Sequence, residues 1–77
     1  MAYRLLETVV LARGLPAHGL EAGDLGAVVH VYEPDGLEVE FVTAAGKTQA
    51  LVTLRETDVR RVEATDLVAV RRLDMSA

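Results

Sequence analysis

The sequence predicts a mainly β protein, a small barrel of five to six antiparallel strands, and three observations support this fold class. Runs rich in valine, phenylalanine, tyrosine and threonine recur from Gly26 to Leu54, which suits strands with one buried face. Two turns separate these runs: residues 34–36 contain the proline, aspartate and glycine of a tight turn, and residues 44–47 contain a glycine. Residues 38–41 alternate glutamate with valine and phenylalanine, the period of two that a strand requires. Such a meander buries one face only if it curls and further strands close it.

The expected strands follow one another in short steps along the chain: residues 7–12, 26–32, 37–43, 48–54, 59–62 and 67–73. Residues 13–20 form a loop around Pro16, which cannot donate to a sheet, and residues 21–24 form the turn into the second strand. Residues 55–58 predict a 3-10 or tight turn before the closing strand. The last segment has two interpretations, a strand over 67–73 or a helix that begins at Thr65, and its β-branched content favours the strand.

Alternation within each strand predicts which side chains enter the core. Glu38 and Glu40 point away from it in the third strand, because a slip of one residue would bury both glutamates. In the second strand we expect Val28, His30 and Tyr32 to lie outside or at the rim. The inward set is then Val29, Val31, Val39, Phe41, Ala50, Val52 and Leu54.

Five or six short strands with a 3-10 break before the closing strand are the pattern of an SH3-like barrel, in which closure removes most unpaired strand edges. The 77 residues make one domain, with its core in residues 7–62 and a C-terminal strand at 67–73. A hydrophobic fraction of 51% is too high for a disordered chain. The sequence therefore predicts a single folded domain.

Composition narrows the classes of function. The chain has no cysteine, so disulfides, thiolate metal sites and thiol nucleophiles are excluded, and a cytoplasmic location is expected. No run of about 18 apolar residues is present, so we expect no membrane-spanning helix. Eight basic and twelve acidic side chains give a net charge of −4, which disfavours binding to nucleic acid.

Several motifs together resemble a known family: Ala22-Gly23-Asp24-Leu25-Gly26-Ala27-Val28-Val29, Val39-Glu40-Phe41-Val42 and Val52-Thr53-Leu54. Over roughly residues 5–62 the chain resembles the bacterial domain-of-unknown-function family 4926, whose members are similar to small SH3-like barrels. The resemblance implies no catalytic residues, since none is assigned in that family. Its members look like companions of neighbouring gene products such as toxins, and this implies an antitoxin or immunity-type role.

The residue types that carry catalysis or hold cofactors do not form a recognisable site. His18 and His30, the only histidines, lack a short ligand spacing, so no metal is expected. The glycines at 23 and 26 precede a valine-rich strand rather than a helix, so no phosphate loop is expected. The serine and threonine residues have no histidine and acid arranged beside them. We therefore expect neither an enzyme nor a cofactor.

The remaining candidates are surfaces that bind a partner. The two glutamates of the third strand, with the tyrosine and glutamate that end the second, predict an acidic face for a basic protein. The arginine pairs at 60–61 and 71–72 predict a basic edge, which either pairs with neighbouring acids or contacts RNA. The candidate partner-binding residues are Tyr32, Glu33, Glu38, Glu40, Arg60 and Arg61.

Two functions from different classes follow from these surfaces. The favoured one is a non-catalytic protein-binding module, in its narrower form the antitoxin or immunity partner of a neighbouring gene product. The alternative is an SH3-like barrel that binds RNA through the arginine edge, which the net charge disfavours. An apolar patch of Val28, Val42, Leu51 and Leu67 would also suit a homodimer, in which residues 67–73 meet across a two-fold axis.

Overall fold

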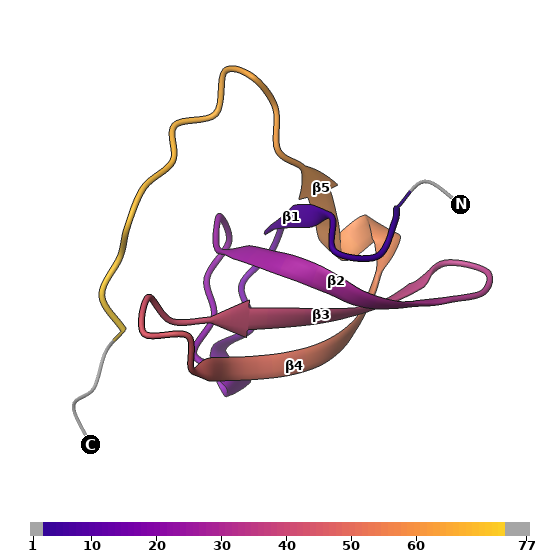
Figure 1. Cartoon of the computed structure of the whole chain (residues 1–77), viewed down its shortest axis with the longest axis horizontal. Helices are drawn as coiled ribbons and strands as arrows, with labels where there is room; N and C mark the ends of the chain where they lie inside the picture. Colours follow the sequence, from indigo (N-terminus) through magenta and orange to yellow (C-terminus); the bar gives the residue numbers. More distant parts are fainter. Residues whose placement is uncertain (1–2, 74–77) are drawn as a thin grey trace.

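The computed structural model describes residues 3–73, which form one sheet of five antiparallel strands with two 3-10 turns (Figure 1). The elements are β1 (Thr8–Leu11), η1 (Pro16–His18), β2 (Leu25–Tyr32), β3 (Gly36–Val42), β4 (Thr48–Arg55), η2 (Glu56–Asp58) and β5 (Val59–Arg61). Each of the first five predicted strands is correct to within one residue at either end. The 3-10 turn before the closing strand is also confirmed.

The strands lie in the order β4-β3-β2-β1-β5, so β4 and β5 are the two edges of the sheet. Val59 of β5 and Leu54 of β4 nevertheless belong to one buried cluster, which requires the sheet to curl until its two ends share a core. Within residues 3–73 no ladder joins β4 to β5, and η2 connects them instead. The mainly β fold is confirmed, with an open curled sheet of five strands in place of a ring closed by hydrogen bonds.

The interior is apolar throughout, and the alternation of β3 sets its middle layer. Leu37, Val39 and Phe41 are buried, while the glutamates between them stay on the outer face, as the pattern predicted. Ala50 and Leu54 from β4 are buried as expected. The full cluster is Val9, Leu11, Leu20, Val28, Leu37, Val39, Phe41, Ala50, Leu54 and Val59.

Two predictions about β2 are wrong: Val28 is fully buried rather than at the rim, and Val29 does not belong to the core cluster that it was expected to join. The pairing with β3 shifts between Val28 and His30, which marks a β-bulge at Val29. A bulge inserts an extra residue into one strand, so Val28 before it and Val31 after it both face the core although they are three residues apart. His30 and Tyr32 then point outward, as expected.

The turn between β1 and β2 is held by its own aspartate. The Asp24 carboxylate accepts a hydrogen bond from the backbone N–H of Glu21 (2.8 Å), and the Asp24 N–H donates to the carbonyl of Glu21 (3.0 Å). Gly23 in this turn has a φ of +98°, a conformation that glycine adopts without steric cost. This turn holds Asp24 just before the start of β2, where the side chain of Arg71 reaches it.

The predicted strand over 67–73 is wrong, and so is the alternative helix from Thr65, since residues 62–73 form neither. After β5 the chain turns at residues 63–66, where Asp66 accepts a hydrogen bond from the Glu63 N–H and its own N–H donates to the Glu63 carbonyl. This turn directs the chain away from the sheet, so the apolar residues that follow do not reach a strand edge. Figure 1 shows the segment arching clear of the strands before it returns beside the end of β3.

Candidate protein-interaction surface

The outer face of β3 presents two carboxylates that hydroxyl groups hold in place. Glu38 accepts hydrogen bonds from the hydroxyls of Thr53 (2.6 Å) and Tyr32 (3.4 Å). Glu40 accepts one from the hydroxyl of Thr48 (2.6 Å). The threonines come from β4 and the tyrosine from β2, so both neighbouring strands orient the two glutamates. Neutral donors fix these carboxylates without cancelling their charge.

An aromatic pair from β2 lies beside these two carboxylates. The rings of His30 and Tyr32 lie 4.4 Å apart between centroids, at a tilted angle of 56°. Partial desolvation, together with the negative charge and hydrogen bond of Glu38, raises the pKa of the Tyr32 hydroxyl. Tyr32 therefore stays protonated near neutral pH and acts as a donor toward Glu38.

Negative charge without an ion pair gathers on the β2–β3 hairpin. Within residues 3–73, no salt bridge involves Glu33, Asp35, Glu38 or Glu40. Of the other acids in the described residues, five lie within salt-bridge distance of an arginine, namely Glu7, Glu21, Asp24, Asp58 and Asp66, while Glu56 and Glu63 do not. We call the four hairpin carboxylates the acidic face. Tyr32, Glu33, Glu38 and Glu40 all lie on this hairpin, and Tyr32 contacts Glu38 through its hydroxyl.

Arg60 and Arg61 do not join this group, because β5 lies at the opposite edge of the sheet from β4 and β3. Arg60 forms a two-pronged ion pair with Asp66, with N–O distances of 2.9 and 3.0 Å. Arg61 donates to Glu7 (2.7 Å), and its guanidinium carbon lies 4.5 Å from the ring centroid of Tyr3. The hydrogen bond from Arg60 is the main reason that the pKa of Asp66 falls to about 2. Both arginines therefore pair with nearby acids, which is the simpler of the two interpretations that the sequence allowed.

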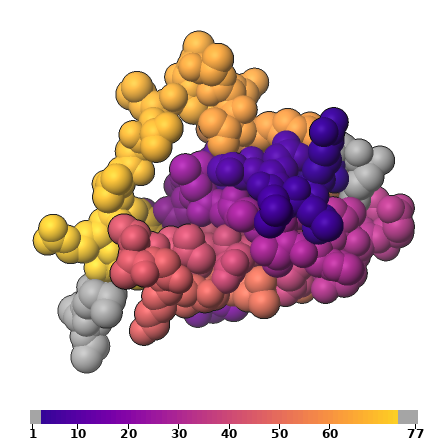
Figure 2. All heavy atoms as spheres, in the orientation of Figure 1, coloured from indigo at the N-terminus to yellow at the C-terminus, as the bar shows by residue number. Residues whose placement is uncertain are grey.

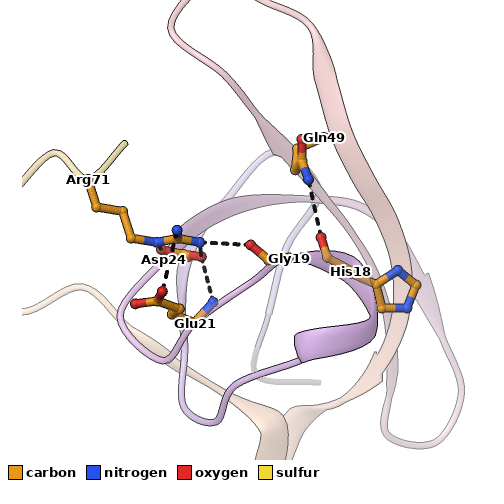
Figure 3. Close-up of polar contacts among 6 residues, drawn as sticks. All are labelled: His18, Gly19, Glu21, Asp24, Gln49 and Arg71. Carbon is orange, nitrogen blue, oxygen red and sulfur yellow. Dashed lines mark hydrogen bonds and ion pairs between the residues drawn. The ribbon is translucent and has the colours of Figure 1, made fainter. Parts of the chain in front are cut away.

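A third arginine pairs with an acid that the sequence did not identify. Arg71 donates from Nε and Nη2 to the two carboxylate oxygens of Asp24 (2.8 and 2.7 Å) and from Nη2 to the carbonyl of Gly19 (2.9 Å), as Figure 3 shows. These bonds lower the pKa of Asp24 and raise that of Arg71. Since 47 residues separate the partners, no local spacing in the sequence reveals the pair. Their opposite charges were the only available signal.

The start of β4 and the turn η1 meet beside this contact. The side-chain amide of Gln49 donates to the carbonyl of His18 (3.2 Å), which links the start of β4 to η1 (Figure 3). His18 and His30 thus lie in different surroundings, and among residues 3–73 no three His, Cys, Asp or Glu residues form a group that could hold a metal ion. No helix in the described part of the chain has the length and apolar character to cross a membrane.

A groove of about 490 Å³ lies between the returning C-terminal segment and the open end of the sheet. Its lining is mostly apolar and includes Leu25, Phe41, Val42 and Val70, with the Asp24–Arg71 ion pair at its margin. Val42 and Leu51 are half exposed, which agrees with the predicted apolar patch, but Val28 belongs to the core and Leu67 to the C-terminal segment. The four residues therefore do not form one patch.

Together these features define a small all-β domain with a carboxylate-rich outer face and an arginine-fastened C-terminal segment. The profile of one family, Domain of unknown function (DUF4926), matches residues 5–61, and the chain belongs to this family. The match covers all five strands and ends at the last residue of β5. No curated protein and no solved structure matches the chain significantly.

Proposed function

We propose that this protein is a non-catalytic protein-binding module whose acidic face receives a basic surface of its partner. The observation that carries the proposal is the set of hairpin carboxylates without an ion pair among the described residues, two of them held by hydroxyl donors. Fixed charge of one sign accelerates encounter with a partner of the opposite sign and suppresses association with acidic proteins. Tyr32 adds a half-exposed aromatic ring of the kind common at protein interfaces.

In its narrower form, the proposal identifies the partner as a toxin-like product of a neighbouring gene, met in the cytoplasm. The resemblance of the motifs to a family of such companions supports this form. The contacts of Arg60 and Arg61 support the protein partner over RNA, because their charge is already balanced by Asp66 and Glu7. Single-strand binding also needs exposed aromatic platforms, and Tyr3 already lies against Arg61.

The test is co-purification of the tagged protein with the product of the adjacent gene, followed by binding kinetics. Replacing Glu38 and Glu40 with lysine reverses the centre of the acidic face. We expect the association rate to fall about tenfold or more at low salt, because electrostatic steering contributes factors of about 10 to 1,000. At high salt the rates of wild type and variant should converge.

A charge-matched control carries Glu21→Lys with Glu63→Lys, which changes the net charge equally but lies outside the acidic face. This control should retain most of the association rate. Equal capture of the partner by the Glu38/Glu40 variant and the wild type would contradict the proposal. Salt-sensitive retention of the protein on RNA, lost on replacing Arg60 and Arg61 with alanine, would favour the alternative.

A further inference from the structure

The segment after β5, residues 62–73, is an extended stretch of chain that we call the C-terminal strap. Leu67, Val68 and Val70 in this strap are 95%, 80% and 97% exposed. Within the described residues, the backbone of residues 67–70 makes no backbone hydrogen bond. Figure 2 shows open space between the strap and the body of the molecule. The strap thus presents apolar side chains and unpaired backbone groups together.

Ion pairs hold the strap at both ends. Near its start, Asp66 is paired with Arg60, and near its end, Arg71 is paired with Asp24 and the carbonyl of Gly19. Between these two fastenings, residues 67–70 read Leu-Val-Ala-Val and contain no charge, proline or glycine. Because the fastenings already restrict the chain, ordering this stretch as a strand costs less conformational entropy than ordering a free tail.

An exposed apolar stretch of this composition is a template for pairing with another strand. Natural proteins protect such edges with charges, proline or a covering element, and residues 67–70 have none of these. Backbone pairing satisfies the free N–H and C=O groups, while the valines pack against a neighbour across the pair. The strap therefore has the chemistry of a strand that lacks its partner.

The charges at the ends of the strap indicate which partner fits. An antiparallel pair of straps related by a two-fold axis at Ala69 places Val68 opposite Val70 and Asp66 opposite Arg72. Each contact occurs twice, as symmetry requires. Arg72 is exposed, and among residues 3–73 it has no carboxylate partner. The sequence of the strap is thus complementary to itself, in apolar character at its centre and in charge at its ends.

We infer that the strap is a self-association site, at which a second copy of this chain pairs antiparallel with the first. Alternating side chains of a strand point to opposite faces of the sheet, so the cross-strand pairs Asp66–Arg72 and Val68–Val70 share one face of the paired straps, while Arg71 lies on the other face and keeps its contact with Asp24. Asp66 retains acceptor capacity, since a carboxylate accepts about four hydrogen bonds and three are described. The inference goes beyond the proposed function, because it uses the strap and not the acidic face.

The resulting dimer is weak and depends on concentration. A two-stranded ribbon is only marginally stable alone, and a few residues from each chain bury less than the roughly 1,000 Å² of a stable interface. Sedimentation equilibrium of the full chain from micromolar to millimolar concentration should show a monomer that becomes a dimer. Val68→Lys with Val70→Lys should weaken dimerisation at least tenfold, and these side chains are exposed enough that the fold is retained.

Two further variants separate the strap from other surfaces. Arg72→Glu places like charges opposite Asp66 and should weaken the dimer, whereas Arg72→Lys should preserve it. Leu51→Lys, a matched apolar-to-lysine change on the outer face of β4, should leave the association unchanged. Nuclear Overhauser contacts between Val68 of labelled chains and Val70 of unlabelled chains would establish the register.

Several results would overturn the inference. One is that the protein stays monomeric at every concentration, whether or not the strap binds a different protein. Another is a dimer that the Val68/Val70 variant leaves intact. Neither result bears on partner capture by the acidic face, which Glu38 and Glu40 test separately.

Discussion

Replacing Gly26 with alanine adds a methyl group at the most crowded glycine position of the fold. Gly26 lies in β2 opposite Val9, and its missing side chain would point into the core. A Cβ atom there would lie 2.6 Å from Cγ1 of Val39, 2.9 Å from Cε1 of Phe41 and 3.1 Å from the carbonyl oxygen of Glu40. Val39 and Phe41 are buried, so neither the Val39 methyl group nor the Phe41 ring can move aside without displacing other core atoms.

This overpacking sets the expected loss in the free energy of unfolding. Extra methyl groups in a well-packed core typically reduce the free energy of unfolding by about 1–3 kcal/mol. In a domain of this size, that loss lowers Tm by about 4–24 °C, at roughly 4–8 °C for each kcal/mol. The assay is thermal and urea unfolding of the purified protein, followed by circular dichroism.

Gly14→Ala is the matched control, because its Cβ would meet no atom closer than 3.6 Å. This variant should be neutral or more stable by up to about 1 kcal/mol, since alanine restricts the unfolded chain. A Gly26→Ala protein as stable as its Gly14→Ala counterpart would refute the assignment of Gly26 to the inner face of β2.

Two further predictions concern the ion pairs. Asp58→Ala should reduce the free energy of unfolding by about 1–2 kcal/mol, and Arg13→Ala should reduce it by about 0–1 kcal/mol. The loss is larger for Asp58 because it also accepts a hydrogen bond from the Arg55 N–H at the start of η2, whereas Arg13 contributes one exposed pair. Equal unfolding midpoints of the two variants in urea would contradict this role of Asp58. Hydrogen bonds from arginine side chains hold the pKa values of Asp24, Asp58 and Asp66 below those of the unfolded chain. The stabilisation that these ion pairs give the fold is therefore present above about pH 4 and is lost as acid protonates the folded state. Since the pKa of Asp66 is about 2, Tm should fall progressively from pH 4 toward pH 2, and a constant Tm over this range would show that the pairs do not stabilise the fold.

The regular part of the fold could be predicted from the sequence because local chemistry determines it. The alternation of glutamate with apolar residues in β3 admits one register, and the glycines at the turns mark where strands end. The bulge at Val29 could not be predicted, since Val28 and Val29 are chemically identical and only the pairing with β3 distinguishes them. Register shifts of this kind depend on the partner strand.

The C-terminal segment shows the other limit of sequence reasoning. Leu67–Val70 has the composition of a strand, yet a strand also needs an edge within reach, and the Glu63–Asp66 turn directs the chain elsewhere. Within the candidate site, the acidic face could be predicted because its residues lie on one hairpin. The Arg71–Asp24 contact could not, since 47 residues separate its two partners.

The most direct test of the acidic face is NMR shift mapping of the labelled protein with the partner that it captures. The account predicts that the amide shifts of residues 32–42 in the hairpin and of 48–55 in β4 change most, and that added salt reverses these changes. Shift changes confined to β5 and to Arg60 and Arg61, with the hairpin unaffected, would contradict it.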